Sequence, residues 1–287
     1  MSLGPDDRPD FSKTALLIAA HGSPHSPGGP SATRTQAETL ANMEIFSEVS
    51  AGFISEKPFI HDVLDDLDAA EIYIVPNLAT TGYIFSQKLP EALGLTGVIT
   101  ERITPRGHQR LILTQPVGTH PLVAQIMAAS IQSTLKNFGL KAEDTALVVI
   151  GHGSTKSRAS FTQTKKVAHE MAQFGLIDLA GHEGIFTAFL EEIPYIQDWH
   201  MQTQAQNIIF APALISDGYH ANRDIPLAIG FDPSDRSFMD NLSKGLASKR
   251  QKDGKCLVYL PPVGLSPDIS EIIFSRVKQA HENLTLT

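Results

Sequence analysis

The sequence predicts an α/β protein made of two similar halves, each with a parallel β-sheet covered by helices. Three observations lead to this prediction. Short apolar runs rich in β-branched residues alternate with stretches of helical period, which is the pattern of right-handed βαβ units. Each half opens with the same phrase, residues 15–23 in the first and 146–154 in the second. The elements that follow keep the same order in both halves, which indicates an internal duplication.

The first half contains four predicted strands. Each is a short apolar run, as expected for a strand that is buried on both faces. Pro58 and Pro121 each open a helix, because proline lacks the N–H group that a helix start leaves unpaired, and Gly139 ends the second of these helices. A loop rich in proline and glycine follows the first strand. The predicted strands are 14–20, 49–54, 72–75 and 111–114, the loop is 21–30, and the helices begin at 36, 58 and 121.

The second half repeats this succession. A helix that ends near Gly175 follows the first strand, a short helix follows Pro194, and a last helix after Pro267 has apolar residues at helical spacing. The charged segment 249–255 is expected to be a solvated loop. The predicted strands are 146–150, 184–189, 207–211 and 256–260.

Three further blocks align between the halves in the same order, so chance is a poor explanation of the repeat. The boundary falls in the polar stretch 141–144, which predicts an N-terminal lobe over 14–142 and a C-terminal lobe over 143–287. A polar, proline-containing lead-in over 1–13 is expected to be disordered. The aligned blocks are 52–58 with 188–194, 76–83 with 212–219, and 115–121 with 261–267.

The bulk composition excludes several classes of protein. The formal net charge of −8 over 287 residues argues against a nucleic-acid-binding protein. No apolar run approaches the roughly 18 residues of a membrane-spanning helix, so no membrane partner is expected. The single cysteine, Cys256, excludes an intrachain disulfide, fits a reducing compartment and lies in an apolar run where burial is expected. A cytoplasmic protein is therefore predicted.

Metal-ligating side chains follow three strands of the second half. His152 comes after the strand 146–150, Glu191 after 184–189, and His220 after the loop that leaves 207–211. The carboxyl ends of parallel strands meet at one edge of a sheet, which is where ligands bind. Two imidazoles and a carboxylate suit a divalent transition metal and leave coordination positions open. The sequence predicts a metal site at this edge.

The first half has lost this pattern. His21, Ser55 and Ile84 stand at the three corresponding positions, so a working site there is not expected. Other interpretations of the second half stay open at this point: either histidine can simply bond to nearby backbone, and Glu192 competes with Glu191 for the role of ligand.

Other chemistries fit poorly. The loop 151–155 is not the G-x-S-x-G nucleophile elbow, because its serine is one place off. No G-x-x-x-x-G-K-[ST] loop is present, which excludes a P-loop NTPase. A Gly-x-Gly pair alone is too weak to predict a dinucleotide site, and no organic cofactor is expected.

These residues resemble a known family, the class II tetrapyrrole chelatases, specifically the CbiX/CbiK-type sirohydrochlorin cobaltochelatases and their ferrochelatase relatives. The resemblance covers about residues 14–280, and the ordered set of motifs, present in both halves, makes it specific. It rests on the strand-His-Gly-Ser opening of both halves, Glu191 with Pro194 soon after, Asp-Gly-Tyr-His at 217–220 with Arg-Asp-Ile-Pro at 223–226, and Pro-Val-Gly at 262–264.

The resemblance implies a chelatase-like fold of two flavodoxin-like lobes, each with a parallel four-stranded sheet, and a macrocycle held in the cleft between them. It assigns metal binding and catalysis to His152, His220 and Glu191. It implies a lyase-class enzyme that inserts Co²⁺ or Fe²⁺ into sirohydrochlorin or a related tetrapyrrole, in cobalamin or siroheme biosynthesis. Some two-repeat members have the working site in the first half, whereas here the residues place it in the second.

Sirohydrochlorin carries many carboxylates, and four basic residues near strand ends are candidates to bind them: Arg223, Lys156, Arg158 and Arg34. The alternative for each is an exposed surface charge. The alternative function is a chelatase-like protein that binds metal or tetrapyrrole without turnover, and a third possibility is an unrelated hydrolytic metalloenzyme. The choice between Co²⁺, Fe²⁺ and Ni²⁺, and between a monomer and a homo-oligomer, stays open.

Overall fold

A computed structural model describes residues 9–23, 31–176, 179 and 184–286 of the chain. Two compact units divide the chain: the first consists of Met1–Val117 and Pro267–Thr287, and the second of Gly118–Ser266. Each unit contains one five-stranded sheet flanked by helices, so the predicted α/β fold with two lobes is confirmed. Within the described part of the chain, no helix is long and apolar enough to cross a membrane.

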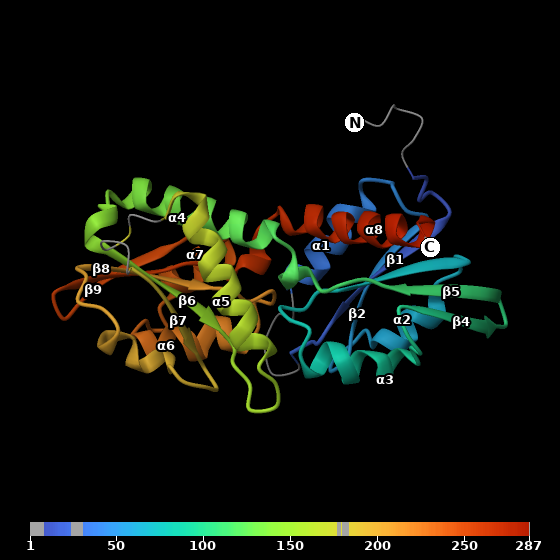
Figure 1. Cartoon of the computed structure of the whole chain (residues 1–287), viewed down its shortest axis with the longest axis horizontal. Helices are drawn as coiled ribbons and strands as arrows, with labels where there is room; N and C mark the ends of the chain where they lie inside the picture. The colour runs from blue at the N-terminus through green and yellow to red at the C-terminus, as the bar shows by residue number, and fades with distance from the viewer. Residues whose placement is uncertain (1–8, 24–30, 177–178, 180–183, 287) are drawn as a thin grey trace. The chain divides into compact units, whose positions relative to one another are not determined.

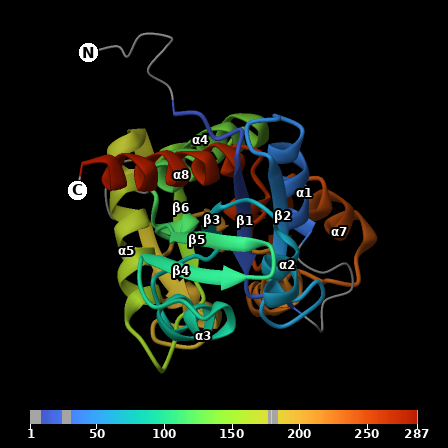
Figure 2. The same ribbon diagram turned by 90° about the vertical axis from the view of Figure 1, so that its right-hand side faces the viewer.

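The sheet of the first unit has the strand order β2-β1-β3-β5-β4. Strand β1, between β2 and β3, is buried at all seven residues, because helices cover both faces of the sheet. Helices α1 and α8 lie on one face, and α2 and α3 lie on the other (Figures 1 and 2). The elements are β1 (Thr14–Ala20), α1 (Ser31–Ala41), β2 (Glu48–Phe53), α2 (Ile60–Asp66), β3 (Glu71–Pro76), α3 (Leu89–Leu93), β4 (Ile99–Thr104), β5 (Gly107–Leu113) and α8 (Ile269–Thr285).

The second unit has the equivalent order, β7-β6-β8-β10-β9. Residues 146, 148 and 150 of β6 face a core shared with α6 and α7, and α4 and α5 contact strands of the same sheet. The elements are α4 (Leu122–Phe138), β6 (Thr145–Gly151), α5 (Ala159–Met171), β7 (Ile185–Phe189), β8 (Asn207–Pro212), α6 (Ile225–Ile229), α7 (Arg236–Ser243), β9 (Ser248–Lys252) and β10 (Lys255–Tyr259).

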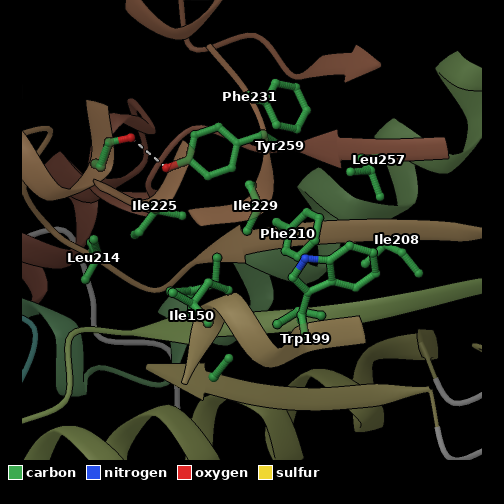
Figure 3. Packing of buried hydrophobic residues seen from close by; sticks show 14 of the residues in the cluster. Ile150, Trp199, Ile208, Phe210, Leu214, Ile225, Ile229, Phe231, Leu257 and Tyr259 are labelled. Carbon is green, nitrogen blue, oxygen red and sulfur yellow. Dashed lines mark hydrogen bonds between the residues drawn. The ribbon is translucent and has the colours of Figure 1, made fainter. Parts of the chain in front are cut away.

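The core of the second unit also supports the strand ends. Figure 3 shows Tyr259 of β10 among Phe231, Ile225 and Ile229, with its hydroxyl at the edge of the cluster. That hydroxyl donates a hydrogen bond of 2.7 Å to the carbonyl oxygen of Ala221, the residue after His220. Burial raises the pKa of the Tyr259 phenol, so the group stays protonated and keeps donating.

The expectation of four-stranded, wholly parallel sheets is corrected by the structure. Each sheet gains one antiparallel edge strand, β4 beside β5 and β9 beside β10. Strand β9 (Ser248–Lys252) overlaps the charged segment 249–255 that was expected to be a loop, and four of its five residues are exposed. An exposed strand lacks the apolar run by which buried strands are recognised. The sequence did contain a signal for this hairpin, the pair Asp253-Gly254, which is typical of a type I′ turn. Both residues adopt the positive φ that such a turn requires.

The compact units also differ from the predicted lobes 14–142 and 143–287. Helix α4 follows the last strand of the first repeat but belongs to the second unit, where it contacts α5 and β8. Helix α8 follows the last strand of the second repeat but belongs to the first unit, where it contacts α1 and β3. The repeats therefore exchange their last helices, and periodicity within a helix cannot show which sheet it covers.

Two predicted boundaries in the first unit differ from the observed ones. Phe11 lies in the lead-in expected to be disordered, yet it is only 3% exposed and its ring contacts Phe46, Tyr73 and Phe274. The prediction that residues 1–13 are disordered is therefore wrong at the C-terminal end of that segment. Helix α1 begins at Ser31 instead of 36, and most of the predicted loop, at 24–30, lies outside the described residues.

Candidate functional site

His152 is placed by the sharp end of β6. Its own carbonyl oxygen accepts hydrogen bonds from the backbone N–H groups of Leu190 and Glu191, at 3.1 and 3.0 Å, which ties the end of β6 to the loop after β7. Gly153 has a φ of +78°, a conformation that side chains with a Cβ rarely adopt. The fold thereby turns the chain sharply after β6 and leaves the His152 imidazole half-buried at the edge of the sheet.

His220 is placed by a short π-helical turn after β8, which spans His220–Asp224. The turn puts the first and last of its five side chains together, and His220 Nδ1 lies 2.7 Å from Asp224 Oδ2. The buried hydroxyl of Tyr259 holds the backbone of the turn at Ala221. The loop after β8 therefore returns its histidine to the edge where β6 ends.

The two imidazoles are neighbours. Their ring centroids are 4.6 Å apart and the rings stand nearly perpendicular, at 84°. His152 Nδ1 lies 2.9 Å from the carbonyl oxygen of Gly153, and His220 Nδ1 faces the Asp224 carboxylate. Carbonyl and carboxylate oxygens only accept, so each Nδ1 carries the ring proton. In the neutral form of each ring, Nε2 then keeps a lone pair, which is the donor that a divalent metal takes.

Glu191 and Glu192 have different surroundings, which the sequence could not distinguish. The Glu192 side chain is 12% exposed, accepts the Ser154 backbone N–H at 3.3 Å and lies 3.5 Å from Arg158. The Glu191 side chain is 51% exposed, and its Oε2 lies 3.9 Å from His152 Nδ1. Glu192 thus holds the loop, whereas Glu191 is the carboxylate beside the imidazoles.

These positions do not amount to a finished coordination shell. Among the described residues, no three His, Cys, Asp or Glu side chains are gathered tightly enough to hold one ion. Glu191 stands on the Nδ1 side of His152, away from the Nε2 lone pair. The structure brings His152 and His220 together and places Glu191 next to them.

The first unit has the same scaffold with different side chains. His21 Nδ1 lies 2.9 Å from the Gly22 carbonyl oxygen, and its Nε2 lies 3.4 Å from the Ser55 hydroxyl. A matching π-helical turn spans Ile84–Lys88 and begins with an apolar side chain. Within the described residues of this unit, no carboxylate is paired with His21. The scaffold is repeated, and the set of donors is not.

The four basic residues have different surroundings. Arg34 donates to Glu56 Oε1 at 3.0 Å and to the Lys57 carbonyl oxygen at 2.9 Å, so its guanidinium is already engaged. The Arg158 side chain is 72% exposed and lies 3.9 Å over the Phe161 ring. Arg223 is exposed, 5.3 Å from the Tyr219 ring centroid, and Lys156 is exposed on the loop after His152. Lys156, Arg158 and Arg223 belong to the second unit, and Arg34 belongs to the first.

Sequence reasoning missed Asp224 and Tyr259. The spacing of four residues between His220 and Asp224 was visible and is the spacing at which helical side chains meet. Tyr259 gave no such signal, because a tyrosine in an apolar run is predicted only to be buried.

The chain matches the CbiX family model twice, over residues 15–134 and 146–280. The chain belongs to the CbiX family. The resemblance to these chelatases that the motifs predicted is therefore confirmed. The two separate matches, one per half, also agree with the internal duplication.

Curated relatives include a "Probable sirohydrochlorin cobaltochelatase" from Halobacterium salinarum, 26% identical over 281 residues, which cover 93% of this chain and 91% of the relative. A sirohydrochlorin cobaltochelatase from Methanopyrus kandleri is 26% identical over 144 residues, 47% of this chain but 96% of the relative. That relative is about the length of one repeat.

Two solved structures share the fold. CbiX, described as the terminal enzyme of siroheme biosynthesis in denitrifying bacteria, aligns with a TM-score of 0.65 and 25% identity over 93% of this chain and 99% of its own. A multi-domain protein from Deinococcus radiodurans, described as similar to chelatases, aligns with a TM-score of 0.69 and 21% identity. The alignment covers 93% of the present chain but only 55% of that protein, and at 21% identity this likeness concerns the fold alone.

Proposed function

We propose that this CbiX-family chain inserts a divalent metal, Co²⁺ in the first place, into sirohydrochlorin or a closely related tetrapyrrole. The observation that carries the proposal is the pair of imidazoles at one sheet edge, with ring centroids 4.6 Å apart and each Nδ1 bonded, which leaves Nε2 of each neutral ring as the donor. Two curated relatives that carry the name sirohydrochlorin cobaltochelatase support the choice of substrate and of cobalt. Fe²⁺ and Ni²⁺ take the same nitrogen and oxygen donors and stay alternatives.

The metal is a substrate, so the site must hold it and then release it. His152 Nε2 and His220 Nε2 supply two neutral donors, and Glu191 supplies one anionic oxygen once its half-exposed side chain turns towards them. Three ligands leave open coordination positions through which the tetrapyrrole nitrogens can replace the protein donors. The absence of a closed cage of ligands in the described residues suits an ion that is handed on.

Proton balance gives these residues a second task. A metal ion that enters the macrocycle replaces two pyrrole N–H protons, so two protons must leave for each ion inserted. When the metal departs, the two Nε2 lone pairs become available again as bases near the macrocycle. We assign the two protons to His152 and His220, with Glu191 as an acceptor that passes them to solvent.

The carboxylates of the substrate need cations in a chain of net charge −8. Three of the basic residues are exposed and belong to the same unit as the two imidazoles: Arg223, Lys156 and Arg158. They follow the strands whose ends carry His152 and His220. We propose that they bind substrate carboxylates by charge-assisted hydrogen bonds. Arg34 and Arg158 would each have to share a guanidinium that already pairs with a glutamate, Glu56 and Glu192 respectively.

The test is an anaerobic insertion assay with sirohydrochlorin and Co²⁺, Fe²⁺ or Ni²⁺ in turn, followed by the absorption change of the macrocycle. The chain should accelerate insertion of at least one metal, and His220→Ala should remove the acceleration. His200→Ala, which removes another exposed imidazole of the same unit, is the control and should keep it. A chain that binds sirohydrochlorin without accelerating insertion of any metal would be a carrier, the alternative function, and would overturn the proposal.

A further inference from the structure

Among the described residues, the shortest contact between a site histidine and an acidic side chain involves Asp224, which is not one of the proposed metal ligands. Asp224 Oδ2 lies 2.7 Å from His220 Nδ1, within charge-assisted hydrogen-bond distance. We propose that Asp224 is a positioning residue, which fixes the tautomer and the ring orientation of His220 so that Nε2 faces the metal. This inference rests on the proposed function and adds a residue to it.

The chemistry of the contact determines the tautomer. A neutral imidazole carries its proton on either nitrogen, and only the other nitrogen can bind a metal. An ionised carboxylate accepts and cannot donate, so Asp224 holds the proton at Nδ1 and the lone pair at Nε2. A carboxylate behind a ligating imidazole also makes it a better donor, and loss of such a partner typically costs about 10–100-fold in metal affinity or activity.

The first unit shows that the turn does not need this carboxylate. The same five-residue π-helical turn is present there, with Ile84 in place of His220 and Lys88 in place of Asp224. Lys88 turns to Glu91, 3.1 Å away, instead of to the first residue of its own turn. The acid occurs together with the histidine in the second unit, and the same backbone turn forms in the first unit with neither of them. Its role is therefore directed at the imidazole.

The backbone of the turn has a support of its own in the second unit. The buried Tyr259 hydroxyl holds the Ala221 carbonyl oxygen at 2.7 Å, next to His220. Loss of the Asp224 carboxylate should therefore free the His220 ring without unfolding the turn. This separation lets a substitution at Asp224 report on the imidazole and not on the stability of the chain.

Two measurements on Asp224→Ala test the proposal. The first is the ¹⁵N NMR signature of the His220 ring in the metal-free chain, which distinguishes a proton on Nδ1 from one on Nε2. The second is a Co²⁺ titration followed by visible absorption. Asp240→Ala removes an exposed acid of the same unit and is the charge-matched control, and Asp224→Asn keeps an oxygen that can accept from Nδ1.

We expect the His220 proton to sit on Nδ1 in the wild-type chain and in Asp240→Ala, and to redistribute to Nε2 in Asp224→Ala. Co²⁺ affinity should fall about 10–100-fold in Asp224→Ala and recover in part in Asp224→Asn. An Asp224→Ala chain with an unchanged tautomer, or with Co²⁺ affinity equal to that of Asp240→Ala, would overturn the positioning role. A wild-type chain that binds no Co²⁺ would count against the proposed function, while the tautomer signal would still decide the role of Asp224.

Discussion

His21 and His152 occupy the same place in their units, and their immediate surroundings are nearly identical. Each follows a fully buried strand, precedes a glycine of positive φ, and holds Nδ1 2.9 Å from that glycine's carbonyl oxygen. They differ in what the neighbouring loops bring. His152 has another imidazole with its ring centroid 4.6 Å away and a carboxylate within 4 Å, whereas His21 has the hydroxyl of Ser55.

The comparison separates the scaffold from the chemistry. Parallel strand ends, the glycine after the histidine and the π-helical turn occur in both units, so they belong to the fold. The donors differ at two positions of that scaffold, Glu191 in place of Ser55 and His220 in place of Ile84, and the carboxylate that contacts His220 differs at a third, Asp224 in place of Lys88. A histidine in this loop is therefore weak evidence of a metal site until its neighbours are known.

The largest difference between the two units is expected when each histidine is replaced in turn. His152→Ala should lower the rate of cobalt insertion by more than about 100-fold, since it takes away a proposed ligand, which should cost more than loss of the partner behind a ligand. His21→Ala is the matched control and should change the rate by less than about threefold, because within the described residues its ring has no metal-ligating neighbour. The assay is the anaerobic insertion reaction with circular dichroism to confirm folding. Equal losses in both variants would mean that the first unit also takes part in the chemistry.

The sequence predicted most of this scaffold because its central parts are repetitive and buried. Strand β1 matches its predicted range, Thr14–Ala20, and α4 ends at Gly139 as expected, since an apolar run and a glycine stop are local features. The edge strand β9 escaped because it is polar, so no pattern of burial marks it. The exchange of α4 and α8 between the units was not predicted, because the helical spacing of apolar residues does not show which sheet a helix covers.

The site was predictable to the level of strand ends and no further. Topology alone brings His152 and His220 to one edge, and the structure makes them neighbours. The choice between Glu191 and Glu192 depends on which carboxylate meets the Ser154 N–H, which two adjacent glutamates in a sequence cannot show. The proposed role of Asp224 could be inferred only from its 2.7 Å contact with His220 Nδ1.

Packing behind the two histidines offers a second, smaller test. Ala20 precedes His21, whereas Gly151 precedes His152, and a Cβ at position 151 would overlap Thr164 Oγ1 and lie 2.9 Å from the Phe189 ring. Gly151→Ala should lower the free energy of unfolding by about 1–3 kcal/mol, the usual cost of overpacking a core. Ala20→Gly, the reverse change in the first unit, should cost only about 0.5–1 kcal/mol. Urea unfolding followed by circular dichroism measures both. A Gly151→Ala chain as stable as the wild type would mean that Thr164 yields freely and that the two strand ends are packed alike.

The smallest expected difference concerns the glutamates that hold the two histidine loops. Glu56 accepts the Ser23 N–H at 2.9 Å and Arg34 at 3.0 Å, whereas Glu192 accepts the Ser154 N–H at 3.3 Å and lies 3.5 Å from Arg158. Both carboxylates are 12% exposed, but the Arg34 side chain is 40% exposed and the Arg158 side chain 72%, so solvent screens the second pair more.

Replacing either glutamate with glutamine keeps one acceptor oxygen and turns an amide NH₂ towards the other donor. Glu56→Gln should lower the free energy of unfolding by about 1–2 kcal/mol, and Glu192→Gln by about 0.5–1 kcal/mol, in the same urea experiment. The shorter contacts then make the loop of the first unit the more firmly held of the two, although its histidine lacks metal-ligating neighbours among the described residues. A larger loss for Glu192→Gln would reverse that order. It would mean that the loop carrying His152 is held more tightly than its contact lengths indicate, as a loop that must present a metal ligand would require.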